Sequence, residues 1–263
     1  MTNSKTKNEL SKEFKDVKYI LTSGMRTKLL LSLYEYPKNL EDLRNELIKP
    51  SATILHGLKE LETINLVKKV QKHYNLTSNG YLLTTNLIKL IENWNSINKS
   101  KKFWNSHNLS DIPEEMLKNI YLLKDAEYVN STTSNLSNAF NNYIKLISNA
   151  KRLKILLPIY SENHFEHLIK QLNENKLEHL ELIVSKDILN SIEKNELLAN
   201  SLLKNDKVHI TTLDMNLKIF LTLSDEFMSL TLFFKDGHYD DSQILIGKDK
   251  NALKWAFNLF SII

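Results

Sequence analysis

Residues 51–80, SATILHGLKELETINLVKKVQKHYNLTSNG, decide the fold of the first part of the chain. A helix is predicted up to about Ile64, because Ile54, Leu58 and Leu61 recur at the spacing of one buried helix face. Residues 65–70 then predict a strand, and 74–76 a strand that returns after a tight connection. Thr77 or Ser78 suits the N-cap of a further helix. The stretch therefore predicts a helix, a hairpin and a second helix.

Two more helices are predicted upstream. One covers Met25 to about Tyr36 and ends before Pro37, and the other covers Leu40–Ile48 with Asn39 as its cap. A partial helical pattern precedes them at residues 12–21. Three helices, a hairpin and a helix are the element order of a winged helix-turn-helix, a domain that places one helix in the major groove of DNA.

Charge is unevenly divided along the 263 residues, whose formal net charge is +4. Residues 1–102 hold 18 Lys+Arg and 10 Asp+Glu, a net charge of +8, whereas residues 103–263 hold 17 and 21, a net charge of −4. A basic domain joined to an acidic one indicates that the first binds a polyanion and the second does not. Chance remains the alternative, because the excess is modest.

Absent residue types exclude several classes of function. With no cysteine, the chain has no disulfide framework, cysteine-ligated zinc, iron–sulfur cluster or thiol catalysis. The first residues carry no apolar segment of the kind that signal peptides need, and no run approaches 18 apolar residues. We therefore expect a cytoplasmic protein without a membrane span.

The second part alternates strands and helices and then carries a run of strands, which predicts a mixed α/β sheet covered by helices. Helices are expected at 136–150, 163–173, 188–203 and 250–260, and strands at 153–157, 180–184, 208–212, 217–223, 229–234 and 244–247. We expect a winged helix-turn-helix domain at 10–95, connecting helices at 96–123 and an α/β effector or regulatory domain at 124–263.

Several motifs resemble known families. Residues 51–67 are similar to the recognition helix and following turn of archaeal and ArsR-type winged-helix regulators, and residues 74–80 to their second wing strand and capped helix. FWNSHNLSDIP at 103–113 with the following predicted helix at 114–123, KDGHYDD at 235–241 and ALKW at 252–255 resemble the archaeal methanogenesis and filament-formation regulators, typical of methanogens. This resemblance implies a C-terminal domain similar to the phospholipase-D-like sheet fold.

The predicted recognition helix and wing supply the candidate DNA-binding residues. On the helix face opposite Ile54, hydroxyl and imidazole groups can bond base edges, lysine can bind phosphate, and a glycine would allow close approach. These residues are Ser51, Thr53, His56, Gly57 and Lys59. The wing adds Lys68, Lys69, Lys72 and His73, of which alternation lets only two or three reach one backbone. Arg26 is a further candidate phosphate contact. The alternative is a solvated surface.

The second part offers weaker candidates. Trp104, Tyr239 and Trp255 are possible lining residues of an effector pocket, although packing aromatics are the more frequent case. Two sets of residues have ligand chemistry but are better explained as surface and loop residues, so we predict no metal and no cofactor. These sets are His164 with His167, and Asp236, His238, Asp240 and Asp241.

No catalytic motif is recognised. Phospholipase-D-like catalysis needs a lysine two residues after a histidine, and His209-Ile210-Thr211 lacks it. We therefore predict that the chain is not an enzyme but a DNA-binding transcriptional regulator. It would act as a homodimer on half-sites about 34 Å apart, with a small-molecule effector or an assembly role for the second domain. The alternatives are a hydrolase or transferase with a winged-helix docking module, and a protein–protein adaptor.

Overall fold

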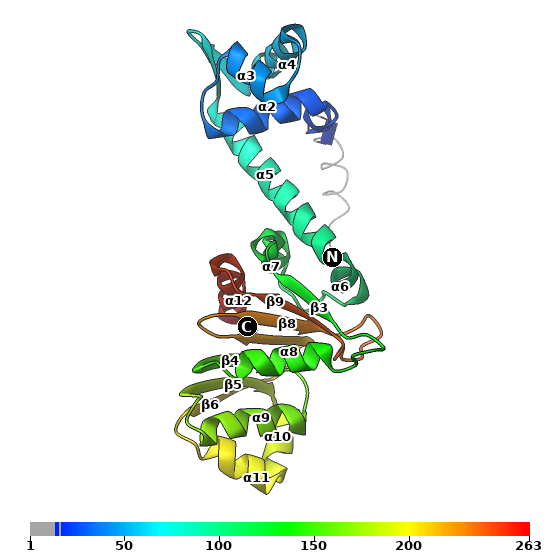
Figure 1. The fold of residues 1–263 in the computed structure, drawn as a ribbon, viewed down its shortest axis with the longest axis vertical. Helices are drawn as coiled ribbons and strands as arrows, with labels where there is room; N and C mark the ends of the chain where they lie inside the picture. Colours follow the sequence, from blue (N-terminus) through cyan, green and yellow to red (C-terminus); the bar gives the residue numbers. More distant parts are fainter. Residues whose placement is uncertain (1–13, 16) are drawn as a thin grey trace. The chain divides into compact units, whose positions relative to one another are not determined.

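The computed structural model describes residues 14, 15 and 17–263, which form two compact units divided between Ile91 and Glu92 (Figure 1). Each unit has its own hydrophobic core. The predicted start of the first domain at residue 10, and part of the helical pattern at 12–21, lie outside the described residues.

The first unit has the element order that the sequence predicts. Three helices are followed by a two-stranded antiparallel sheet and a long helix. The elements are α2 (Gly24–Glu35), α3 (Leu40–Leu47), α4 (Ser51–Thr63), β1 (Val67–Val70), β2 (His73–Leu76) and α5 (Ser78–Lys99). Because α5 ends at Lys99, it extends past the boundary at residue 91 into the second unit.

Caps and a small core explain why these short helices form. The Ser23 side chain accepts a hydrogen bond from the backbone of α2, and Asn39 and Asp42 form a reciprocal capping box at the start of α3. The apolar faces meet in a core that includes Leu29, Leu30, Leu33, Leu43, Ile54, Leu58 and Leu61. At the start of α5, a Cβ on Gly80 would lie 2.0 Å from the carbonyl oxygen of Leu66, so only glycine fits there.

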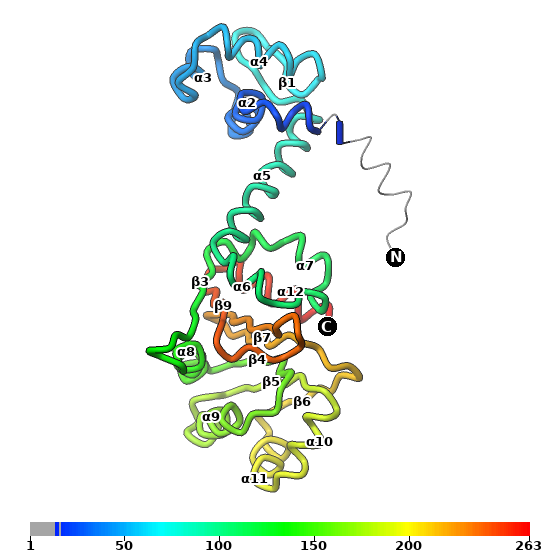
Figure 2. The backbone as a smooth tube through the Cα atoms, turned by 90° about the vertical axis from the view of Figure 1, so that its right-hand side faces the viewer, coloured from blue at the N-terminus to red at the C-terminus, as the bar shows by residue number. Residues whose placement is uncertain are grey.

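A seven-stranded mixed sheet forms the centre of the second unit, in the order β3-β9-β8-β7-β4-β5-β6. Figure 1 and Figure 2 together label its strands. Three strands at one side run parallel, and the remaining pairs are antiparallel. The strands are β3 (Glu127–Asn130), β4 (Arg152–Leu157), β5 (His179–Ser185), β6 (Val208–Leu213), β7 (Ile219–Leu223), β8 (Met228–Leu232) and β9 (Gln243–Gly247).

Helices cover both faces of this sheet, and each face has its own core. One face packs against α8 (Asn138–Ile147), α9 (Glu162–Asn173), α10 (Lys186–Lys194) and α11 (Glu196–Leu198). The opposite face packs against α6 (Lys101–Ser106), α7 (Glu114–Lys118), the short helix at Ile120–Leu123 and α12 (Lys250–Ile262). The predicted mixed sheet covered by helices is confirmed.

The segment at 96–123, expected to hold connecting helices, lies in the second unit. Phe103 is 0% exposed, and Met116 and Leu123 are also buried in the core of that unit. The short helices of this segment therefore cover one face of the sheet.

Two long predicted helices are interrupted, and one strand was not predicted. The helix expected at 114–123 breaks at Asn119, and the one expected at 188–203 breaks at Asn195, which has an extended backbone and caps the next turn. Strand β3 pairs with β9 although only four residues form it. Such a short edge strand carries little periodic signal.

In the part of the chain that the structure describes, no helix is long and apolar enough to span a membrane.

Candidate nucleic-acid interface

Helix α4 presents most of its predicted contact residues to solvent. Thr53, His56 and Lys59 are exposed, and Ser51 at the start of the helix is half-buried. Ile54, Leu58 and Leu61 point into the core, as the spacing predicts. The outward face therefore combines hydroxyl, imidazole and ammonium groups, which are able to bond bases or phosphates.

Gly57 lies on the other side of this helix from the expected contacts. It is buried, and a Cβ at this position would lie 2.8 Å from Leu29 Cδ1 and 3.1 Å from Met25 Cγ. The close approach that this glycine permits is therefore between α4 and α2, and its expected role against DNA is wrong.

Arg26 is not available for phosphate. Its side chain is buried, with Nη1 2.9 Å from Glu60 Oε1, Nη2 donating to the backbone oxygen of Tyr19, and the guanidinium lying over the Tyr19 ring. Burial opposes ionisation of Glu60, but the hydrogen bond and charge of Arg26 outweigh it and lower the pKa of Glu60. The arginine thus joins α2 to α4 instead of extending the candidate surface.

The register of the wing assigns its lysines to different faces. Lys69 pairs with Tyr74, and its ammonium lies 5.2 Å from the centre of the Tyr74 ring, on the face that carries buried Val67. Lys68 pairs with Asn75, on the opposite face, which also carries His73. Lys72 lies in the turn and is exposed. Lys68, Lys72 and His73 therefore form the outward set, and Lys69 does not share their face.

Buried Lys38 holds the β2 strand of the wing, a role that the sequence did not predict. Its backbone exchanges two hydrogen bonds with Tyr74, at 3.1 and 2.8 Å, and so pairs with β2 on the edge opposite β1. Its ammonium lies 2.7 Å from Glu46 Oε2 and 3.2 Å from Ser32 Oγ. This lysine is 1% exposed. A lysine beside a turn normally indicates solvent, so no sequence signal identified it.

Two of the three effector candidates in the second unit are core residues. Trp255 is 0% exposed and donates to the backbone oxygen of Met116, and Trp104 is packed in the same core. Their expected role as pocket residues is wrong, because this face of the sheet needs large apolar side chains to fill it. Tyr239, by contrast, lines a cavity on the other face, between the sheet and α8.

Two of the family-like motifs meet at a buried hydrogen bond between a histidine and a carboxylate. His107, from the stretch 103–113, places Nε2 2.9 Å from Asp240 Oδ2, from the stretch 235–241, and both side chains are almost completely buried. The carboxylate also accepts hydrogen bonds from Ser242 and Gln243. His107 Nδ1 lies 2.6 Å from the backbone oxygen of Phe103. The motifs thus hold α6 against the loop between β8 and β9.

The candidate metal ligands do not assemble into a site. Across the described residues, no group of three or more histidine, cysteine or acidic side chains is placed to hold a metal. His164 is buried among aromatic rings, with Nδ1 2.9 Å from Ser161 Oγ. Burial, with a smaller contribution from the charge of His167, lowers the pKa of His164 to about 4.

Comparison with known proteins finds matches in both units. Residues 14–94 match the N-terminal domain of the methanogenesis regulatory protein FilR1, and residues 136–262 match its middle domain. The two matched segments are therefore similar to two successive domains of that regulatory protein. The curated FilR1 of Methanothrix harundinacea is 24% identical over 254 residues, which are 94% of this chain. The chain spans 56% of the length of that relative.

Solved structures give weaker likenesses. The archaeal chromatin protein TrmBL2, described as showing a novel mode of DNA binding, is 15% identical, with 89% of each chain covered and a TM-score of 0.39. The riboflavin dimethyltransferase RosA of Streptomyces davawensis is 12% identical, with 81% of this chain and 67% of its own covered and a TM-score of 0.27. Scores this low do not establish a shared fold. The expected likeness to the phospholipase-D-like fold finds no support among these matches.

Proposed function

We propose that the chain is a DNA-binding transcriptional regulator whose first unit is a winged helix-turn-helix. The observation that carries the proposal is the surface formed by α4 and the wing. Lys59, Lys68 and Lys72 are exposed there, and none forms an ion pair with the described residues. Free cations beside an exposed helix are the arrangement that binds phosphates while the helix contacts bases. The FilR1 family match supports this function.

A homodimer follows from the same proposal, because one recognition helix contacts only a few base pairs. Helix α5 provides a surface for the second copy. Leu90, Trp94 and Ile97 follow one another at spacings of four and three residues, and they are 57%, 60% and 36% exposed. Apolar side chains at this spacing form one stripe, which a helix buries against a partner. We infer that α5 pairs with α5 of a second copy.

The second unit would supply regulation and not catalysis. Its match to the FilR1 middle domain supports a regulatory role, and in β6 His209 is followed by Ile210 and Thr211 without the lysine that phospholipase-D-like chemistry needs. A signal acts on DNA binding only if it binds one arrangement of the protein more tightly than another.

The test is binding of the full chain to a fluorescent random-sequence duplex at several salt concentrations. Six phosphate contacts from two copies give a log–log slope of about −5.4, so affinity falls about 40-fold between about 0.1 and 0.2 M salt. The triple substitution Lys59→Ala, Lys68→Ala, Lys72→Ala should abolish most of this dependence.

A matched triple substitution in the second unit, of the exposed residues Lys145, Lys170 and Lys204, removes the same charge elsewhere and should leave the slope unchanged. Equal losses from both triples would reject α4 and the wing as the interface. Binding that does not respond to salt would favour a protein–protein adaptor instead.

A further inference from the structure

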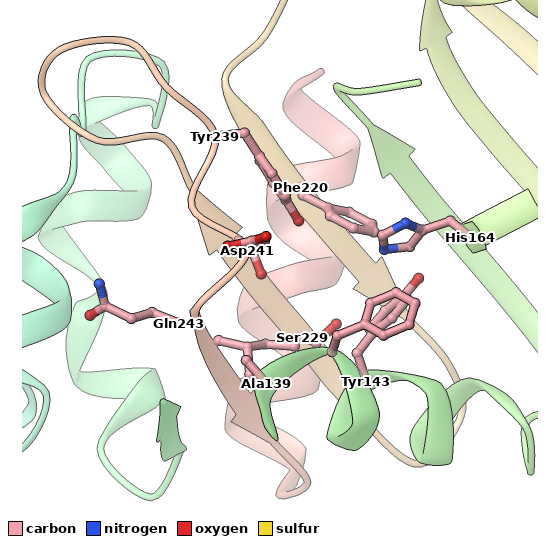
Figure 3. A pocket seen from close by; sticks show the side chains of 11 residues that line it. Ala139, Tyr143, His164, Phe220, Ser229, Tyr239, Asp241 and Gln243 are labelled. Carbon is pink, nitrogen blue, oxygen red and sulfur yellow. The ribbon is translucent and has the colours of Figure 1, made fainter. Parts of the chain in front are cut away.

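The cavity beside Tyr239 lies on the sheet face that packs against α8 (Figure 3). Strand β8 lines this cavity with buried hydroxyl side chains. Met228, Leu230 and Leu232 fill the core on one face of this strand, as alternation requires, while Ser229 and Thr231 point to the other face. Hydroxyl side chains normally mark a solvated face, yet these two are 3% and 6% exposed.

Aromatic rings form the walls of the cavity. Phe220 lies at their centre, with ring centroids 5.3 Å from Tyr143, 5.3 Å from His164 and 6.3 Å from Tyr239. Phe140 adds a fifth ring, 5.1 Å from His164. Aromatic faces carry partial negative charge and attract cations.

Polar side chains of the cavity can accept hydrogen bonds. Tyr143, His164 and Gln243 already have partners, whereas two others have none among the described residues. Figure 3 shows the Asp241 carboxylate and the Tyr239 hydroxyl pointing toward the same space above Ser229. In the described part of the chain, neither Asp241 nor the Ser229 hydroxyl has a hydrogen bond or ion pair from its side chain. Asp241 is exposed at the mouth, and Ser229 is buried.

Positive charge is missing from this lining. No lysine or arginine contributes to it, and His164 is neutral near pH 7 because burial lowers its pKa to about 4. An anionic ligand would therefore meet a carboxylate without any compensating cation. Burial also raises the pKa of Tyr239 well above its usual value, so its hydroxyl stays protonated.

We propose that this cavity binds a small protonated alkylamine, whose ammonium group donates to Asp241 and Ser229 while its alkyl group packs on the aromatic rings. The volume of about 30 Å³ limits the ligand to a few non-hydrogen atoms, since one water molecule needs about 10–15 Å³ on this measure. The inference rests on the proposed regulatory role only where an effect of the ligand on DNA binding is concerned. Binding of the amine to the cavity does not depend on DNA.

The experiment measures binding to the full chain by ligand-observed NMR and calorimetry at pH 7, with methylammonium and ethylammonium as probes. Methanol, ethanol and acetate test whether charge matters, and tetramethylammonium tests whether an N–H donor matters. Dissociation constants in the millimolar range are expected, because so few atoms limit the attainable affinity. The two ammonium ions should bind, the alcohols and acetate should not, and tetramethylammonium should bind at least tenfold more weakly.

Two substitutions locate the site. Asp241→Asn should weaken methylammonium binding about tenfold, and Ser229→Ala about threefold, whereas Asp236→Asn removes a carboxylate from the same loop and should change nothing. Asp241 and Asp236 are both exposed, so these variants keep the fold. Equal binding of methanol and methylammonium, or binding that is unaffected by Asp241→Asn, would overturn the proposal. Loss of DNA binding by the α4 and wing variants would leave this result untouched, so the two proposals fail separately.

Discussion

Replacing Asp240 by asparagine tests the buried hydrogen-bond cluster that joins the two motifs of the second unit. The perturbation keeps the shape of the side chain and removes its charge. Asp240 accepts from His107 at 2.9 Å, from Ser242 through its backbone at 2.8 Å and its hydroxyl at 2.6 Å, and from Gln243 at 2.6 Å. An asparagine oxygen can accept only part of this set, and its amide would face donors.

Asparagine leaves part of the buried donor set of His107, Ser242 and Gln243 without an acceptor, which costs about 1–3 kcal/mol per donor and about 3–5 kcal/mol in total. With a urea dependence of about 2 kcal/mol per M for a unit of this size, the unfolding midpoint falls by about 2 M. Fluorescence of Trp104 and Trp255, both buried in the same unit, reports the transition.

The chain supplies a matched control in the same loop. Asp236 pairs with His238 at 3.1 Å, but both side chains are largely exposed. Exposed pairs contribute little, because water screens them. Asp236→Asn should therefore leave the midpoint unchanged. Equal shifts from the two substitutions would refute the reasoning, because burial is the only main difference between the pairs.

Three further predictions concern the first unit and the cavity. Lys68→Ala should reduce the salt slope of DNA binding by about 0.9 per copy, whereas Lys69→Ala should not, and a larger effect of Lys69 would contradict the assigned faces. The pKa of His164 is lowered from 6.5 to about 4, so the unfolded chain binds more protons than the folded chain as the pH falls. The free energy of unfolding should therefore fall by about 3 kcal/mol between pH 7 and 4. His164→Gln should flatten this pH dependence, measured by urea titrations at each pH. Gly57→Ala places a methyl group 2.8 Å from Leu29 Cδ1. This contact should outweigh the gain in helix propensity and lower the stability by about 1–2 kcal/mol. A raised melting temperature would instead show that α2 shifts to make room for the methyl group.

Local sequence signals were sufficient for the elements of the first unit. Pro37, Asn39 and Thr77 mark helix ends by their own chemistry, and apolar spacing on α4 assigns its buried face without reference to other residues. The same signals failed for Arg26 and Gly57. Their roles depend on Glu60 and Leu29, and spacing within one helix does not reveal which groups a second helix brings near.

The second unit shows the same limit on a larger scale. Its buried strands were predicted from continuous apolar runs, whereas β3 depends on its pairing with β9. A buried hydrogen bond joins His107 to Asp240 across 133 positions of sequence. Likewise, nothing in a single strand indicates that the hydroxyls of Ser229 and Thr231 are covered by α8. Such sites arise from tertiary packing and had no local signal.

The hydrogen bonds between Lys38 and Tyr74 attach the wing to the helical core before any ligand arrives. A hairpin of two four-residue strands is marginal alone, but here the buried lysine that pairs with β2 also contacts Glu46 and Ser32 through its side chain. A segment that is already ordered loses little conformational entropy on association. The wing is therefore preorganised, and the entropic cost of binding DNA falls mainly on the flexible ends of its lysine side chains.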